Sequence, residues 1–184
     1  MSMKYCDFVA AIQSEDNVHK RYHDCLYGFP IDDDNELFGR LILEINQAGL
    51  SWETILKKEA NFRKAYHNFD IKTVAAYDDA DVQRLLSDAG IIRNKLKVHA
   101  AIYNANRIIE LQKEMGSLKN WLDKNHPKTK DEWVKLFKKH FKFVGGEIVN
   151  EFLMSIGYLG GAHAEYCPVY TDIIKLNPAW LVDK

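Results

Sequence analysis

Apolar residues recur at intervals of three and four along most of this sequence, which is the spacing of one face of an α-helix. The clearest series are Leu37, Leu41 and Ile45; Val82, Leu85 and Leu86; and Val98, Ile102, Ala105 and Ile109. No segment alternates apolar and polar residues over the length of a strand. Because only 4 prolines and 10 glycines interrupt the 184 residues, the pattern predicts an all-α fold.

Residues that cap helices mark where these segments begin and end. Side chains that can accept a hydrogen bond from a first-turn amide stand at 32–35, Ser51, Asp79 and Asn94. Gly49 and Gly90 are expected to end two of the helices in the left-handed conformation. We expect further helices over 117–124, 130–141 and 146–156, and irregular structure over 160–184.

The length of the chain suits one domain, residues 1–184, with at most two small lobes. No apolar run approaches the roughly 20 residues that cross a bilayer, so we expect no membrane partner. The N-terminus lacks the apolar segment of a secretory signal, which favours a cytoplasmic protein. The cysteines Cys6, Cys25 and Cys167 are too few for a disulfide framework and are expected to be buried thiols or metal ligands.

Charge is distributed unevenly along the chain. The net charge is −1, but residues 93–142 hold 13 Lys and Arg against 5 Asp and Glu, a local excess of +8. A segment this basic can follow a polyanion such as DNA, since neutralised phosphates release counterions. A solvated helix face accounts for the same charge equally simply.

The segment from Leu85 to Lys97 joins two of the expected helices through a short apolar turn. A turn of this kind can point backbone N–H groups and the positive end of the second helix at a phosphate. We expect phosphate contacts from Gly90, Ile92, Arg93, Lys95 and Lys97. The alternative is a plain corner between two helices, with lysines that lie on its surface by chance.

Four blocks of the sequence together resemble a known family. They are Tyr22-His23-Asp24; Gln47-Ala48-Gly49-Leu50-Ser51-Trp52; Leu85 to Ala105; and Phe141-Lys142-Phe143-Val144-Gly145 with Phe152-Leu153-Met154. In order and content they resemble the DNA-3-methyladenine glycosylase I family of base-excision repair. The resemblance implies a helix-hairpin-helix glycosylase fold and a bacterial enzyme. Such an enzyme works as a monomer on double-stranded DNA that contains alkylated bases.

The family's reaction requires a pocket for a cationic, flipped-out purine. A tryptophan face stacks on such a base and attracts its charge, while a carboxylate accepts hydrogen bonds from its exocyclic amine. By resemblance, Glu44 is the catalytic carboxylate, and Trp52, Tyr22, Phe8 and Tyr27 contact the base. From the pattern alone, Glu44 reads as a helix-edge acid paired to a lysine, and Trp52 as a core aromatic.

The chain departs from the family pattern around this pocket. Leu26 and Tyr27 stand where the family has an acid and a tryptophan, Phe8 where a tryptophan is common, and Ile45 where a glycine follows the pocket acid. No Gly/Pro-rich loop with a catalytic aspartate follows residue 110. The implied mechanism therefore has no covalent step, and the enzyme leaves an abasic site without cutting the strand.

A second group of residues suggests a metal. His163 and Cys167 are four apart, and Cys6 and His23 lie near the other end of the chain. On spacing alone the metal signal is weak, and the favoured interpretation is two buried thiols and two surface histidines. The resemblance implies that Cys6, His23, His163 and Cys167 hold a structural Zn²⁺ that ties the chain ends together. Four protein ligands leave no open position for a catalytic water, which disfavours a zinc hydrolase.

Two functions of different classes remain. The first is excision of 3-methyladenine-type bases by nucleotide flipping and hydrolysis of the N-glycosidic bond. The second is a non-catalytic, zinc-containing relative that binds DNA or senses lesions. Release of free methylated base from alkylated DNA separates the two.

Overall fold

The computed structural model describes residues 4–181, and within these the secondary structure is helical with no strand. The first helices are α1 (Tyr5–Ala10), α2 (Val18–Cys25), α3 (Asp34–Gln47), α4 (Trp52–Ala65), α5 (Ile71–Ala75), α6 (Asp79–Ser87) and α7 (Lys95–Met115). They are followed by α8 (Leu118–Asn125), α9 (Lys130–His140), α10 (Gly146–Ser155) and α11 (Pro168–Lys175), with short 3-10 turns at His67–Phe69 and Ala179–Leu181. The all-α prediction is confirmed. The three residues at each end of the expected domain 1–184 lie outside the described residues.

Side-chain caps begin most of these helices, as the sequence predicts. Asp33 accepts the amide of Glu36 at 2.9 Å, and Asn94 accepts that of Lys97 at 3.2 Å. The cap of α6 is Asp78, one residue before the expected Asp79. Each cap satisfies one amide that the first turn leaves without a helical partner.

The structure corrects two expectations about helix ends. Helix α6 ends at Ser87 and not at Gly90, whose amide instead donates to Asp88 Oδ1 at 2.7 Å. The stretch 160–184 is also not wholly irregular, because α11 forms there with Pro168 in its first turn and buries Ile173. Proline is pre-set for a helix start, but only packing on the rest of the chain makes so short a helix stable.

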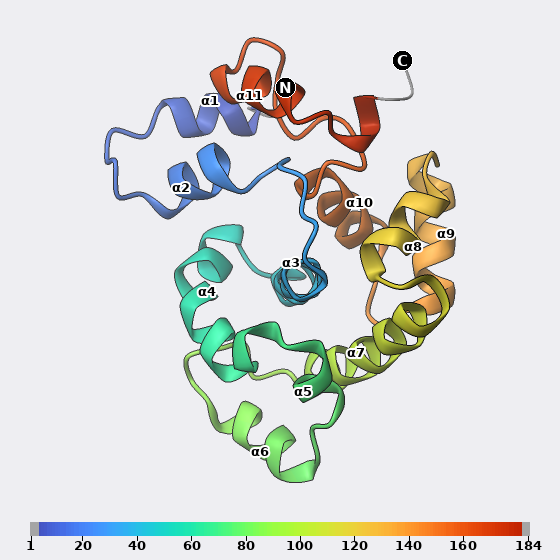
Figure 1. Ribbon diagram of the computed structural model, residues 1–184. Coiled ribbons are helices and arrows are strands. Elements are labelled where there is room, and N and C mark those ends of the chain that lie inside the picture. The colour runs from blue at the N-terminus through green and yellow to red at the C-terminus, as the bar shows by residue number, and fades with distance from the viewer. Residues whose placement is uncertain (1–3, 182–184) are drawn as a thin grey trace.

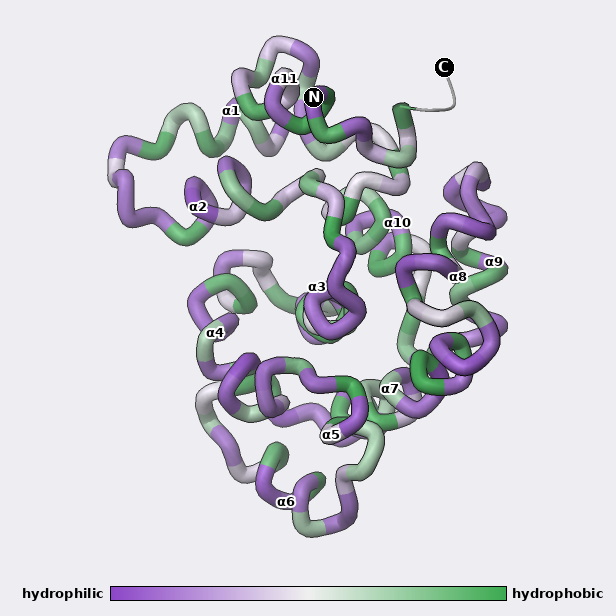
Figure 2. The backbone as a smooth tube through the Cα atoms, in the orientation of Figure 1, coloured by the Kyte–Doolittle hydropathy of each residue, from purple (hydrophilic) through white to green (hydrophobic). Residues whose placement is uncertain are grey.

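Helix α3 lies at the centre of the molecule and is viewed along its axis in Figure 1, with the other helices around it. All of its residues from Leu37 to Asn46 are buried. Gly39 permits this packing, since a Cβ there would overlap the ring of Phe69. Most other helices carry green and purple residues within single turns (Figure 2), as expected for helices with one buried face.

The two ends of the described chain lie together. In Figure 1, α11 lies beside α1 and α2, at one end of the molecule. The Tyr166 hydroxyl donates to Asp7 Oδ1 at 2.6 Å, across 159 residues of sequence.

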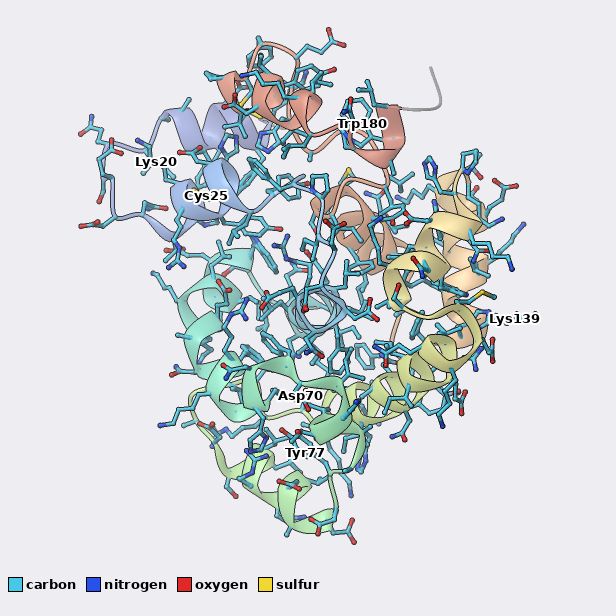
Figure 3. The ribbon with its side chains drawn as sticks, viewed as in Figure 1. Lys20, Cys25, Asp70, Tyr77, Lys139 and Trp180 are labelled. Atoms are coloured by element: carbon cyan, nitrogen blue, oxygen red, sulfur yellow. The ribbon has the colours of Figure 1, made fainter. Side chains whose placement is uncertain are left out.

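Cys25, labelled on α2 in Figure 3, is exposed and is therefore not the core thiol or metal ligand that we expected. Among the described residues, no helix combines the length and the apolar character that crossing a membrane requires.

Candidate active site and metal centre

An open cleft of about 450 Å³ lies between α3, α4, α10 and the N-terminal helices. Its walls are aromatic and acidic side chains: Tyr5, Tyr22, Tyr27, Glu44, Gln47, Trp52, Glu147 and Glu151. Among the expected base contacts, Tyr22, Tyr27, Glu44 and Trp52 thus meet in one place. The volume falls in the usual range of small-molecule sites.

One wall of the cleft is aromatic. Trp52, half-buried at the start of α4, meets the Tyr22 ring edge-on at a centroid distance of 5.0 Å. Tyr22 in turn packs on Tyr27 at 5.4 Å. Phe8 is not part of this wall: its side chain is 41% exposed and stacks on Tyr5 at 6.1 Å, outside the residues that line the cleft. Phe8 therefore packs on Tyr5, which does line the cleft.

The carboxylate of Glu44 lies at the base of the cleft and is only 4% exposed. It is not a helix-edge acid paired to a lysine. Burial raises its pKa to about 8; the nearby Arg40 guanidinium opposes this rise, and Glu151 adds to it. Arg40 is itself buried and donates to the Tyr22 hydroxyl at 3.4 Å and to the carbonyls of Leu26 and Ser155.

Helix α10 adds two acids to the cleft that the sequence analysis did not single out. Glu147 and Glu151 are one turn apart on α10 and both line the cleft. The Tyr27 hydroxyl donates to Glu151 Oε2 at 3.1 Å, and burial raises the pKa of Glu151. Glu147 is more exposed and pairs with Lys130 at 3.0 Å. The signal available in the sequence was two acids four residues apart on an otherwise apolar helix.

The junction between α6 and α7 is held tightly. Ile91 is buried at 3% exposure, and the Lys58 ammonium donates to the carbonyls of Ala89 and Gly90 at 2.9 and 3.2 Å. Gly90 and Ile92 are half-buried. Arg93 and Lys95 are exposed on either side of the Asn94 cap, so the start of α7 presents two cations to solvent.

Lys97 has a different place from the one that we expected. Its side chain is 4% exposed, and its ammonium donates to the carbonyls of Asn46 and Ala48 at 2.9 and 2.8 Å. These carbonyls lie at the C-terminal end of α3, where acceptors lack helical partners and the helix dipole is negative. Lys97 therefore caps α3 and is not available to a phosphate.

The four expected metal ligands meet although they come from both ends of the chain. One donor atom from each of Cys6, His23, His163 and Cys167 lies within 4.8 Å of all the others, and all four residues are buried. Cys167 Sγ is 3.6 Å from His163 Nδ1 and 3.7 Å from His23 Nε2. Cys6 Sγ is 3.8 Å from His163 Nδ1. The histidines are therefore not surface residues, and the group could hold a metal ion.

Outer contacts orient both imidazoles toward this group. His163 Nε2 donates to the Tyr27 carbonyl at 2.8 Å, which leaves Nδ1 facing the thiols. His23 Nδ1 lies 2.6 Å from Asp24 Oδ1, which leaves Nε2 facing Cys167. Partners of this kind fix the orientation of metal-binding histidines. Tyr27 thus contacts His163 of the candidate metal ligands through its main-chain carbonyl, and it also lines the cleft.

Comparison with known proteins identifies the family. The family model described as methyladenine glycosylase matches residues 12–135. DNA-3-methyladenine glycosylase 1 of Escherichia coli (strain K12) is 35% identical over 187 residues, covering 91% of this chain and 97% of that protein. DNA-3-methyladenine glycosylase of Haemophilus influenzae is 33% identical, covering 86% of this chain and 95% of that protein.

A solved structure shares the fold as well as the sequence. It is that of 3-methyladenine DNA glycosylase I from Staphylococcus aureus, described as giving the structural basis of 3-methyladenine recognition. The match has a TM-score of 0.79 and 30% identity, and it covers 92% of this chain and 97% of that one. The family model covers residues 12–135, which is more than half of this chain. The chain therefore belongs to the methyladenine glycosylase family of DNA glycosylases.

Proposed function

We propose that this chain is a monofunctional DNA-3-methyladenine glycosylase. It flips an alkylated nucleotide out of double-stranded DNA and hydrolyses the N-glycosidic bond. The observation that carries the proposal is the buried Glu44 beside Trp52 and Tyr22, at the base of a cleft open to solvent. The relatives named above, whose own names specify 3-methyladenine, support the same substrate.

The geometry suits a base that is already positively charged. The Trp52 ring offers a π face to the base, and a cation over an indole gains about 0.5–2 kcal/mol. The Glu44 carboxylate, ionised opposite such a cation, accepts hydrogen bonds from the exocyclic amine. When the glycosidic bond breaks, its electron pair neutralises the departing base, and a water molecule adds to the sugar carbon and releases a proton to solvent. Catalysis then comes from positioning and electrostatic contact with a good leaving group.

DNA is held, on this proposal, by the junction of α6 and α7. Arg93 and Lys95 contact phosphates, and the half-buried Gly90 and Ile92 bring the backbone close to the strand. Phosphate contacts position the duplex without reading its sequence, which suits an enzyme that must find a lesion in any context. Residues 1–184 act as one domain, with the cleft between the N-terminal helices and the rest.

A structural Zn²⁺ fits the group of Cys6, His23, His163 and Cys167. Zinc–sulfur and zinc–nitrogen bonds of about 2.3 and 2.0 Å place tetrahedral S and N ligands about 3.5 Å apart. Three S···N distances in the group, 3.6–3.8 Å, are close to this spacing. The bound metal would supply a crosslink between the two chain ends, and Tyr27 would link that crosslink to the cleft.

The decisive experiment is base release. Duplex DNA methylated with dimethyl sulfate is incubated with the protein, and free 3-methyladenine is measured by chromatography. We expect release by the wild type, uncut abasic strands as the other product, and loss of release in Glu44→Gln and Trp52→Ala. DNA binding without any release would instead identify a non-catalytic relative that senses lesions.

A further inference from the structure

The cleft contains a second, half-buried carboxylate besides Glu44, that of Glu151. Glu44 projects from α3 and Glu151 from α10, and the two helices pack together. The negative charge of Glu151 raises the pKa of the Glu44 carboxyl. The pocket thus presents acids from two walls, with the Trp52 and Tyr22 rings beside them.

Arg40 acts on Glu44 and Lys130 on Glu151 only through their charge. Within residues 4–181, neither Glu44 nor Glu151 has a Lys or Arg nitrogen within 4.0 Å. The buried Arg40 lies near Glu44, but its hydrogen bonds go to Tyr22 and to two carbonyls. A buried carboxylate beside a half-buried one, without an ion-paired cation, is unfavourable unless one of them holds a proton or a cation enters.

Glu151 is also held in position. The Tyr27 hydroxyl donates to its Oε2 at 3.1 Å, and the Tyr27 carbonyl accepts from His163 in the metal group. The ring of Tyr27 is 7% exposed and packs on Tyr22. A carboxylate fixed in this way presents its charge to the cleft without rotamer entropy to lose on binding.

We propose that Glu151 is a specificity-determining residue: together with Glu44 it forms a two-sided carboxylate site that selects a flipped purine carrying positive charge. A neutral base of the same shape leaves both acids without a counter-charge, whereas an alkylated cationic base supplies it. Discrimination then comes as much from the penalty on the neutral base as from attraction to the cationic one. The inference rests on the proposed function, because it assigns the substrate class of the same cleft.

A matched pair of free bases tests the inference. The probes are 3,9-dimethyladeninium, a permanent cation, and 9-methyladenine, which lacks one methyl group and the charge. Dissociation constants are measured by calorimetry for the wild type, Glu151→Gln and the control Glu53→Gln. Glu53 adjoins Trp52 on α4 but pairs with Lys57 at 2.7 Å, outside the residues that line the cleft, so its substitution makes the same charge change nearby.

We expect Glu151→Gln to weaken binding of the cation by about 10- to 100-fold, the usual effect of losing a charged hydrogen-bond partner. Binding of the neutral base should change less than about threefold, and Glu53→Gln should match the wild type. Tyr27→Phe, which removes the hydroxyl that orients Glu151, should shift the preference in the same direction by a smaller factor. It serves as the test if Glu151→Gln does not fold.

An unchanged preference for the cation in Glu151→Gln, or equal losses for both probes, would overturn the inference. The proposed function fails separately, when the wild type releases no 3-methyladenine from methylated DNA. A wild type that releases the base while Glu151→Gln keeps the cation preference would reject the role of Glu151 alone.

Discussion

Replacing Glu44 by Gln keeps the size of the side chain and removes an acid that the folded protein holds almost out of contact with water. The carboxyl has an ordinary pKa of 4.5, and burial raises it to about 8 in the native state. The native chain therefore binds this proton more tightly than the unfolded chain does. Between these two values, raising the pH costs the wild type stability, because the folded protein must either keep the proton or bury a charge.

The magnitude follows from the size of the shift. Each pKa unit corresponds to about 1.4 kcal/mol, so the wild type should lose about 1.4 kcal/mol per pH unit relative to Glu44→Gln across this range. The total over the shift from 4.5 to about 8 approaches ~5 kcal/mol. Below pH 4.5 the carboxyl is protonated in both states, and its titration contributes nothing to the difference.

Urea denaturation of both proteins from pH 4 to 9 measures this difference in the free energy of unfolding. The Glu44→Gln variant should become progressively more stable than the wild type as the pH rises, while its release of 3-methyladenine falls by about 10- to 100-fold. Glu53→Gln, an exposed acid on α4, should follow the wild type from pH 5 upward. Parallel stability curves for the wild type and Glu44→Gln would refute the burial argument, whatever happened to activity.

Three further outcomes follow from the structure. Cys167→Ser should lose bound metal, measured by atomic absorption, and should melt at a lower temperature; equal metal content in variant and parent would reject the Cys2His2 site. Neutralising Arg93 and Lys95 together should weaken DNA binding and reduce the slope of log K against log salt by about 0.9 per lost phosphate contact; an unchanged slope would remove this junction from the DNA interface. Lys97→Met should leave that slope unchanged but lower the free energy of unfolding by about 1.5–3 kcal/mol, since two carbonyls lose a charged donor; a smaller salt slope would show that Lys97 reaches DNA after all.

Lys95 and Lys97 lie in different surroundings that the sequence does not distinguish. Both follow the Asn94 cap and both are basic, so we expected phosphate contacts from both. The turn of α7 sends Lys95 to solvent and Lys97 against the end of α3, about 50 residues earlier in the chain. The direction of a side chain on a helix is local, but what it meets depends on another helix.

Glu151 shows the same limit of sequence-based prediction at the candidate site. Its helix was expected from the apolar pattern, and its charge is visible in the sequence, yet nothing local indicates that α10 faces α3 across a cleft. Phe8 is the opposite case, because the family resemblance suggested that its side chain contacts the base. Packing directs it onto Tyr5 and outside the cleft.

The sequence by itself predicted α3, α4 and α6 to α10 and most of their beginnings, because periodicity and capping act over a few residues and need no distant partner. It did not predict the shorter α1, α2, α5 and α11, whose stability depends on packing against the rest of the chain. It also carried enough family resemblance to predict a pocket acid, a stacking tryptophan and four metal ligands. Only the tertiary structure decided which charges are buried, which face solvent and which face one another. Those properties depend on contacts between residues far apart in the chain, such as Cys6 with His163 or Tyr27 with Glu151, and desolvation exists only once the chain has closed around them.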